Sequence, residues 1–159
     1  MNYTRRGTCS TFGGPHDTGV GAAEDLALYE HADVAKAPDG LFLEKQPAGT
    51  TGTARRLNPA ALYCAMRFAY TQQMRGTHKP GLGTCLDVVT SRAWLHQHPL
   101  LVSNPKHPNL PPIEVHAVDW GPNSDTGRII DLSPGAAAAL GVQTDDEVIV
   151  TIPIPVSNE

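Results

Sequence analysis

Two acidic residues lie where the sequence pattern can hold a side chain in place for chemistry. Asp119 ends a segment in which apolar and polar residues alternate, and the turn-forming pair Gly121-Pro122 follows it. Asp131 lies in a second strand-like segment that begins at Arg128 and leads into an expected helix. A positioned carboxyl group can donate a proton and, once ionised, accept one. Asp119 is therefore the first candidate for a catalytic acid or base.

Each charged candidate also has a purely structural interpretation. Asp119 can accept backbone N–H groups ahead of the Gly-Pro turn. Asp131 sits between apolar residues just before a helix, where a carboxylate usually satisfies backbone donors or pairs with an arginine, and we predict such a scaffold role for it. Arg128 can pair with a carboxylate of the site or with a substrate, or it can lie solvated at the end of its strand.

Aromatic and imidazole side chains extend the candidate binding site. Trp120 directly follows the acid and offers a flat surface for stacking on a sugar, although a tryptophan can also simply be packed. Trp94, His96 and His98 come just before an apolar segment at Leu100–Ser103. The His-x-His spacing places both rings on one side of an extended chain, but with no third ligand in view we predict no metal site.

The elements that must position these residues are short strands separated by turns. Residues 15–52 are expected to form loops with two short strands, one of them at Leu41–Leu43. The other expected strands are the segment from Gly7 to the glycine turn at Gly13-Gly14, Cys85–Val89, Leu100–Ser103, Ile113–Asp119, the segment from Arg128 and Glu147–Ile152. Such a series, with one or two short helices and long loops, fits a closed mainly β barrel without exposed edges.

The sequence also predicts two helices, and it predicts which side chains of one strand lie on each of its two faces. Asn58 as N-cap and Pro59 as first residue predict a helix running into 63–68, and Ser133-Pro134 opens a second one that ends at Gly141. Strict alternation in Ile113–Asp119 places Ile113, Val115 and Ala117 on an apolar face and assigns Glu114, His116 and Val118 to the opposite face.

Length, charge and hydropathy limit the classes of function. A chain of 159 residues is expected to form one domain over 1–159, in which 1–56 is a loop-rich extension containing the first strand. The net charge is −4 and the basic residues form no cluster, so we expect no nucleic-acid partner. No apolar run is long enough to span a bilayer, and residues 1–14 lack the apolar core of a secretory signal, so we expect no membrane insertion and see no export address.

Three cysteines, Cys9, Cys64 and Cys85, leave two redox states open. They can be buried and reduced, or two of them can form one disulfide in an oxidising compartment and leave one free thiol. Their spacing is too wide for a Cys/His zinc site.

The segments around the two aspartates resemble a known family. Val118-Asp119-Trp120-Gly121-Pro122 and the segment from Gly127 to Ser133 resemble the Asp-x-Gly-Pro and Gly-Arg-x-Ile-Asp-Leu-Ser signatures of RlpA-like double-psi β-barrels. Rare lipoprotein A, the expansins and some lytic transglycosylases share this fold. The resemblance covers about Leu101 to Ile152, and the segment from Gly7 to Gly14 loosely matches the opening of such domains. It implies a six-stranded double-psi β-barrel, with Gly121, Pro122 and Asp131 in structural places.

The resemblance also implies a chemistry for Asp119. In these families the corresponding aspartate lies in a surface groove that accepts a polysaccharide, and in the lytic members it is the proposed acid. It would protonate the glycosidic oxygen and then take a proton from the sugar's own 6-hydroxyl, which gives a 1,6-anhydro product. Ordinary hydrolysis requires two carboxylates instead, for which Asp125 and Asp131 are the nearest candidates.

Two departures from the family pattern bear on activity. RlpA-like enzymes carry arginine directly after the aspartate, where this chain has Trp120. They also carry a histidine in an Ala-Ala-His-x-x-Leu-Pro segment, and the local match over residues 58–67 places Met66 there. His96 or His98 would have to supply a replacement from a different point in the chain.

Two functions of different class follow. One is a lytic transglycosylase-like enzyme that cleaves peptidoglycan at the cell wall or outside the cell, with Asp119 as acid and base and without a cofactor. The other is a non-catalytic module, expansin-like or inhibitor-like, that uses the same groove to hold a polysaccharide or a protein partner. The retained aspartate favours the first, and the missing histidine favours the second.

Overall fold

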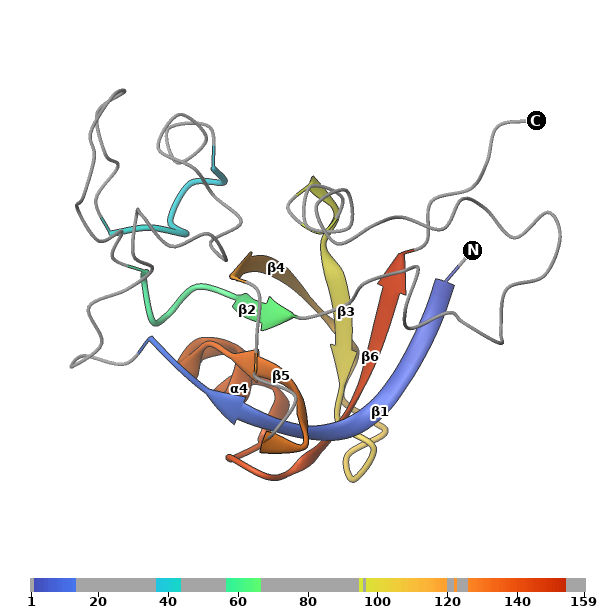
Figure 1. Ribbon diagram of the computed structural model, residues 1–159. Helices are drawn as coiled ribbons and strands as arrows, with labels where there is room; N and C mark the ends of the chain where they lie inside the picture. Colours follow the sequence, from blue (N-terminus) through green and yellow to red (C-terminus); the bar gives the residue numbers. More distant parts are fainter. Residues whose placement is uncertain are drawn as a thin grey trace, which may run out of the picture.

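Six strands close into a barrel in which sequence neighbours are not always spatial neighbours (Figure 1). The computed structural model describes residues 2–13, 37–43, 57–66, 95, 97–119, 122 and 126–153. The strands are β1 (Asn2–Thr11), β2 (Tyr63–Met66), β3 (Leu100–Ser103), β4 (Ile113–Asp119), β5 (Arg128–Leu132) and β6 (Glu147–Pro153). One complete helix, α4 (Pro134–Leu140), is described. The predicted mainly β six-stranded barrel is thereby confirmed.

The two halves of the chain interlock. The strand order around the barrel is β1-β5-β2-β4-β3-β6, with β1–β5 and β2–β4 parallel and the other pairs antiparallel. Strand β5 lies between β1 and β2, while β2 lies between β4 and β5. Each half therefore inserts one strand between two consecutive strands of the other.

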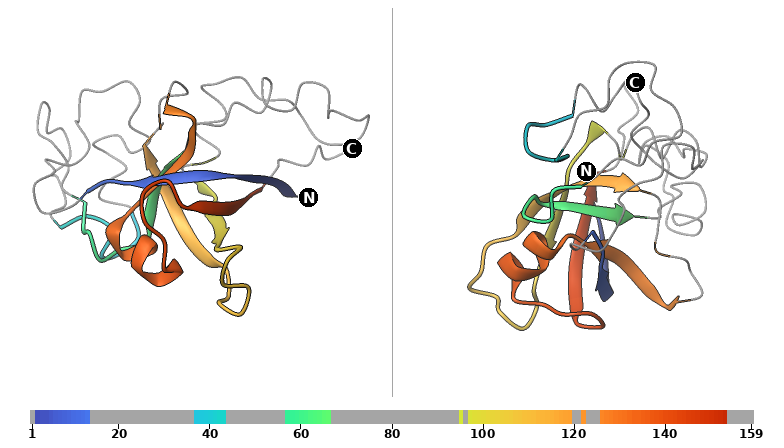
Figure 2. Two further views of the ribbon diagram at one scale, coloured as in Figure 1. Left: turned by 90° about the horizontal axis from the view of Figure 1, so that it is seen from below. Right: turned by 90° about the vertical axis from the view of Figure 1, so that its left-hand side faces the viewer.

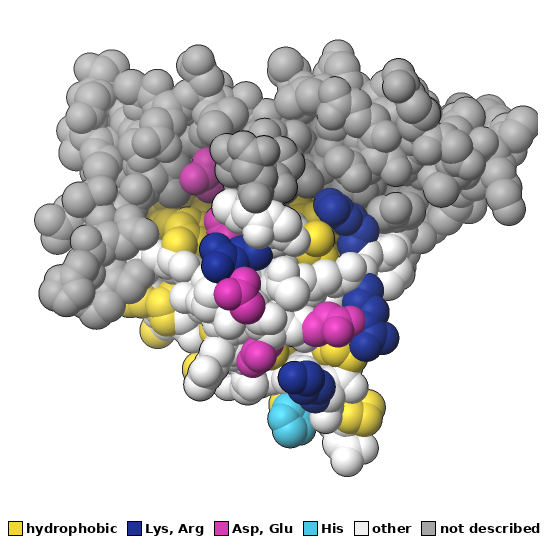
Figure 3. Space-filling model, turned by 60° about the horizontal axis from the view of Figure 1, so that its bottom comes forward, with side chains coloured by type: hydrophobic (Ala, Val, Ile, Leu, Met, Phe, Trp, Pro, Cys, Tyr) yellow, Lys and Arg dark blue, Asp and Glu magenta, His cyan; other side chains and the backbone are white. Residues whose placement is uncertain are grey.

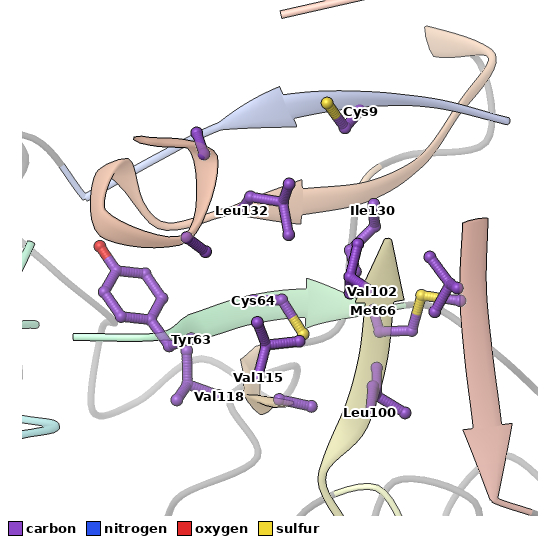
Figure 4. Close-up of a cluster of buried hydrophobic side chains, with 14 of the residues drawn as sticks. Cys9, Tyr63, Cys64, Met66, Leu100, Val102, Val115, Val118, Ile130 and Leu132 are labelled. Atoms are coloured by element: carbon purple, nitrogen blue, oxygen red, sulfur yellow. The ribbon is translucent and has the colours of Figure 1, made fainter. Parts of the chain in front are cut away.

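The interior is filled by apolar side chains from every strand. Figure 4 shows the side chains of Met66, Leu100, Val102 and Ile130 converging inside the barrel, and all four are fully buried. Cys9 and Cys64 also belong to this core and are free thiols. That agrees with the reduced alternative for these two cysteines, while Cys85 lies outside the described residues.

A β-bulge interrupts the alternation of β4 and corrects one expectation. In the pairing with β2, Cys64 lies opposite Ala117 and Ala65 opposite Asp119, so Val118 is an extra residue. The prediction that Val118 shares the polar face is wrong, because its side chain is fully buried beside that of Ala117. A bulge turns two successive residues to one side and re-aims the next. Asp119 therefore faces outward, whereas strict alternation would have turned it inward with Ala117.

The helix predicted from Asn58 into 63–68 is also wrong, since Tyr63–Met66 is strand β2. Residues 58–61 form a turn instead, in which Ala61 N–H donates to the carbonyl of Asn58 at 2.9 Å and the Asn58 side chain accepts from Ala60 N–H at 3.1 Å. Asn followed by Pro starts a β-turn as well as it caps a helix.

The remaining expectations have mixed outcomes. Strand β1 extends well before Gly7, and Leu41–Leu43 contributes only an isolated bridge between Phe42 and Leu57. The second helix is confirmed: Ser133 caps its first turn, and Gly141 ends it at φ 68°. The strand expected at Cys85–Val89 lies outside the described residues.

Helix α4 is held against the segment that enters β2 (Figure 2). Gly135 N–H donates to the carbonyl of Pro59 at 2.8 Å, and a Cβ at Gly135 would lie 2.6 Å from the Ala60 carbonyl oxygen. Ser133 joins the same contact, because its hydroxyl donates to the carbonyl of Ala61 at 2.6 Å and accepts from Ala136 N–H at 3.0 Å. This contact fixes the start of β2 relative to the end of β5.

Candidate functional site

Four residues from four adjacent strands form a row across the barrel. In the strand registers, Ser10 of β1 lies opposite Asp131 of β5, Asp131 opposite Ala65 of β2, and Ala65 opposite Asp119 of β4. Directly paired residues project to the same side of a sheet. The row faces away from the core, because the residues on either side of Ala65 in β2 point into the barrel. We call these four residues the outer row.

The outer row places two carboxylates on either side of one strand. Neighbouring strands lie about 4.8 Å apart, so the backbones of Asp119 and Asp131 are separated by about 9.5 Å across β2. Ala65 between them has the smallest side chain that a non-glycine residue can have, and it is 3% exposed. Sequence spacing alone could not show that the two aspartates share one face.

Asp131 is half-buried and carries a specific partner. The Ser10 hydroxyl donates a hydrogen bond to its Oδ1 atom. Burial raises the pKa of the Asp131 carboxyl above its ordinary value, although the Ser10 hydrogen bond and the positive charge of Arg128 both oppose that rise. A carboxyl group with a raised pKa is better suited to hold a transferable proton. The scaffold role predicted for Asp131, through backbone donors or an arginine, stays a prediction, and the hydrogen-bond partner that the structure gives this carboxyl group is the Ser10 hydroxyl.

Asp119 is the last residue of β4 and is half-buried. The bulge at Val118 aims it onto the outer face, as described above. Pro122, in the predicted turn after it, is also half-buried. Trp120 and Gly121 lie outside the described residues, so the expected stacking surface beside the acid stays a prediction.

Arg128 binds a carboxylate that does not belong to the outer row. Its Nε donates to Asp145 Oδ1 at 2.9 Å and its Nη2 to Oδ2 at 3.3 Å. These hydrogen bonds lower the pKa of the Asp145 carboxyl. Asp145 has a left-handed backbone with φ 70°, and its N–H donates to the carbonyl of Cys9 at 2.7 Å. Arg128 thus ties the turn before β6 to β5 and acts on Asp131 only through its charge.

His98 comes just before strand β3. Strand β3 runs antiparallel to β4 with Leu100 opposite Val115, so His98 lies toward the end of the barrel at which β4 terminates. The residue is half-buried. Trp94 and His96 lie outside the described residues. Met66, which the family pattern matches to a histidine, is fully buried inside the barrel and is no part of the outer row.

A cavity of about 690 Å³ opens further back along β4. Its apolar wall includes Leu41, Leu62 and Ile113, and its polar groups include Asp39, Glu114 and His116. Sequence reasoning missed this cavity and also missed Ser10. The available signal for Glu114 and His116 was their place on the polar side of the β4 alternation. Their neighbours in the cavity come from residues 38–41 and 58–62, which no sequence pattern links to β4.

Charges of both signs are mixed over the face of the described residues drawn in Figure 3. Two ion pairs among the described residues join charges of opposite sign, Arg6 of β1 with Glu147 of β6 and Arg128 of β5 with Asp145 in the turn before β6. Among the described residues, no three His, Cys, Asp or Glu side chains are grouped closely enough to hold a metal ion, and no described helix has the length and hydropathy to cross a bilayer.

No model of a protein family matches the chain, and no curated protein matches it.

Proposed function

We propose that this protein is a cell-wall glycan-active member of the RlpA-like double-psi barrels and that it cleaves peptidoglycan strands in the manner of a lytic transglycosylase. The observation that carries the proposal is the outer row, in which Asp119 and Asp131 flank Ala65 on one face of the barrel. The sequence signatures around the same two residues support it independently.

In the proposed reaction each carboxyl group has its own role. Asp131, whose pKa burial raises, donates its proton to the glycosidic oxygen, and the bond from that oxygen to the sugar's C1 breaks. The 6-hydroxyl oxygen of the same sugar then forms the new bond to C1, and its proton passes to the Asp119 carboxylate. The product is a 1,6-anhydro sugar, and no water is consumed. Solvent exchange returns both carboxyl groups to their starting states.

Retaining glycosidases place their two carboxyl groups about 5 Å apart, whereas enzymes that accommodate an attacking oxygen between acid and base place them about 6.5–9.5 Å apart. The backbones of Asp119 and Asp131 are separated by about 9.5 Å across β2, which leaves room for an attacking oxygen between the two carboxyl groups. Ser10 acts as a positioning residue, because its hydroxyl holds the Asp131 carboxyl in place.

The second candidate is a non-catalytic polysaccharide-binding or inhibitor-like barrel. Met66 favours it, because the residue matched to the family's histidine points into the core and offers no group to a bound polymer. Both candidates use the same face, and they differ in whether a bond is broken.

Product analysis on purified peptidoglycan separates the two candidates. The wild type is expected to release fragments with 1,6-anhydro ends, detected by mass spectrometry. Asp119→Asn and Asp131→Asn are each expected to lower the rate by about a hundredfold or more, the usual effect of losing a proton-transfer group. Asp145→Asn is the matched control, because Asp145 pairs with Arg128 outside the outer row, and it should keep the rate.

Other outcomes would change the assignment. Fragments with ordinary reducing ends that take up ¹⁸O from labelled water would show hydrolysis in place of the anhydro reaction. Binding of insoluble peptidoglycan without any product would establish the non-catalytic module. Neither binding nor cleavage would remove both glycan functions.

A further inference from the structure

The cavity and the outer row lie along one strand. Glu114, His116 and Asp119 all project from the outer face of β4, because the bulge at Val118 restores Asp119 to the side of the other two. Asp119 comes three positions after His116 in the strand, which corresponds to about 10 Å. A single sugar ring bound at Asp119 does not reach His116, whereas a longer strand lying along β4 does.

The cavity has an apolar wall on one side and hydrogen-bonding groups on the other. Leu41 is buried and Leu62 and Ile113 are half-buried, so these side chains form a fixed apolar surface. The Asn58 amide belongs to the frame, since it donates to the carbonyl of Gly40 at 2.8 Å and accepts from Ala60 N–H. It thereby holds the loop at residues 38–41 against the entry to β2.

Glu114 and His116 remain as the groups that can meet a ligand. Both line the cavity, and neither side chain forms a hydrogen bond with the residues that the structure describes. A carboxylate accepts hydrogen bonds, while an imidazole can donate one and accept one. Sugar hydroxyls do both, and the opposite faces of a sugar ring carry apolar C–H groups. The volume of about 690 Å³ lies within the range of small-molecule sites.

We infer that this cavity is a second carbohydrate subsite, which binds a sugar of the glycan strand away from the bond that is broken. The inference rests on the proposed function and extends it, since it makes length of the glycan a determinant of binding. Glu114 and His116 determine affinity for long strands and have no part in proton transfer.

Calorimetric binding to glycan strands of different length tests the subsite. Peptide-free strands of two and of eight sugars, prepared from peptidoglycan, are titrated into Asp119→Asn protein so that cleavage is slow during the titration. His116→Ala and Glu114→Gln, added to that background, are each expected to weaken binding of the eight-sugar strand about fivefold, the equivalent of one hydrogen bond, and to leave the two-sugar strand unchanged. His107→Ala is the matched control, because His107 is exposed in the turn before β4 and lies outside the cavity.

The outcomes separate failure of the subsite from failure of the proposed function. Absence of binding by the Asp119→Asn parent and by wild type alike would remove the glycan function itself. Binding of long strands that is unchanged by both cavity variants would overturn the subsite and leave the function standing. Equal weakening for both lengths would place His116 and Glu114 in the same site as Asp119. Thermal unfolding of each variant identifies any loss of fold.

Discussion

Asp131 is the residue at which burial and electrostatics oppose each other most directly. Burial disfavours its charged form, while the Ser10 hydrogen bond and the charge of Arg128 favour it, and burial prevails. Because the pKa is raised in the folded state, ionisation of Asp131 destabilises the fold. That cost is absent when the pH is below the ordinary value of 3.8 and grows as the pH rises through the folded-state value.

The effect of replacing Asp131 by asparagine, its neutral isostere, on the stability of the fold is therefore expected to depend on pH. Asp131→Asn should unfold at a higher temperature than the wild type at pH 7, and the difference should shrink to zero as the pH falls to about 3.8. Differential scanning calorimetry from pH 3 to 7 measures it. A variant less stable than the wild type at pH 7 would show that the charged hydrogen bond from Ser10 outweighs burial. Asp145→Asn, whose carboxyl has a lowered pKa, should behave in the opposite sense and serves as the comparison.

At this scale the sequence located the two aspartates but not their relation. Their signatures are local, and each can be recognised within a few residues. Their separation depends on β2 lying between β4 and β5, and β2 is a segment that its local signals assign to a helix. Ser10 could not be assigned for the same reason, because its register against Asp131 joins opposite ends of the chain.

The bulge in β4 is the element whose effect on the site is largest. Period-two alternation predicts the inward face correctly up to Ala117 and then fails at Val118. Nothing in the residues of β4 marks the extra position, since Val and Ala fit either side of a strand. The pairing with β2 decides it, and that pairing is a tertiary contact.

A pair of substitutions in β4 tests the bulge. Val118→Ser should lower the free energy of unfolding by about 3 kcal/mol, because it places a hydroxyl in the core and leaves a cavity. His116→Ser, on the outer face two residues earlier, should change it by less than about 0.5 kcal/mol. Urea unfolding followed by tryptophan fluorescence measures both. Equally small effects of the two substitutions would show that the side chains of β4 alternate strictly and that Asp119 points toward the interior.

Ser133 connects three elements through one hydroxyl group. Besides capping α4 and donating to Ala61, its Oγ accepts a hydrogen bond from the N–H of Tyr63 at 3.3 Å. The side chain is fully buried. Loss of the hydroxyl would therefore leave backbone groups of the β2 entry and of the helix start without a partner in the interior.

Two substitutions distinguish an ordinary cap from this wider role. Glycine usually replaces serine at an N-cap at a cost of only a few tenths of a kcal/mol. Here Ser133→Gly and Ser133→Ala should both cost about 2–3 kcal/mol, because the partners of the hydroxyl become buried and unsatisfied. Chemical denaturation gives these values, with the exposed Thr144→Ala as the control. A small loss of stability in Ser133→Gly would show that Ser133 acts only as a helix cap.

The helix signals show how far local chemistry determines an element. Ser133-Pro134 and Gly141 predict α4 correctly, because a Pro-Gly-Ala sequence between them has no competing strand pattern. Asn58-Pro59 carries equally good signals for the start of a helix. The following Tyr63–Met66 nevertheless forms strand β2, which pairs with β4 and β5 in the barrel. Burial of all four of its residues outweighs the local preference.

At the scale of the whole molecule, the closed barrel protects its thiols. Burial, reinforced by the charges of Asp146 and Asp145, raises the pKa of Cys9 to about 11. Burial also raises the pKa of Cys64. Thiolates are the reactive form, so at pH 8 only about a thousandth of Cys9 is ready to react even before access is considered.

Thiol labelling reports on this closure. In Cys85→Ser protein, a thiol-specific disulfide reagent at pH 8 should react at least about a hundredfold more slowly with the native state than with protein in urea, and two thiols should react on unfolding. Urea-unfolded protein that shows no free thiol until a reductant is added would indicate a bridge between Cys9 and Cys64 and contradict the structure.

The interlocked strand order also sets when the barrel can form. Strand β1 is made early, yet both of its neighbours, β5 and β6, come from the far end of the sequence. While the chain is being synthesised, β1 has no partner and exposes an open hydrogen-bonding edge of the kind that recruits other strands. Contacts this distant in sequence close slowly. The growing chain therefore passes through a period of aggregation risk that ends only after β6 has been released, and chaperones that shield β1 during that period should raise the yield.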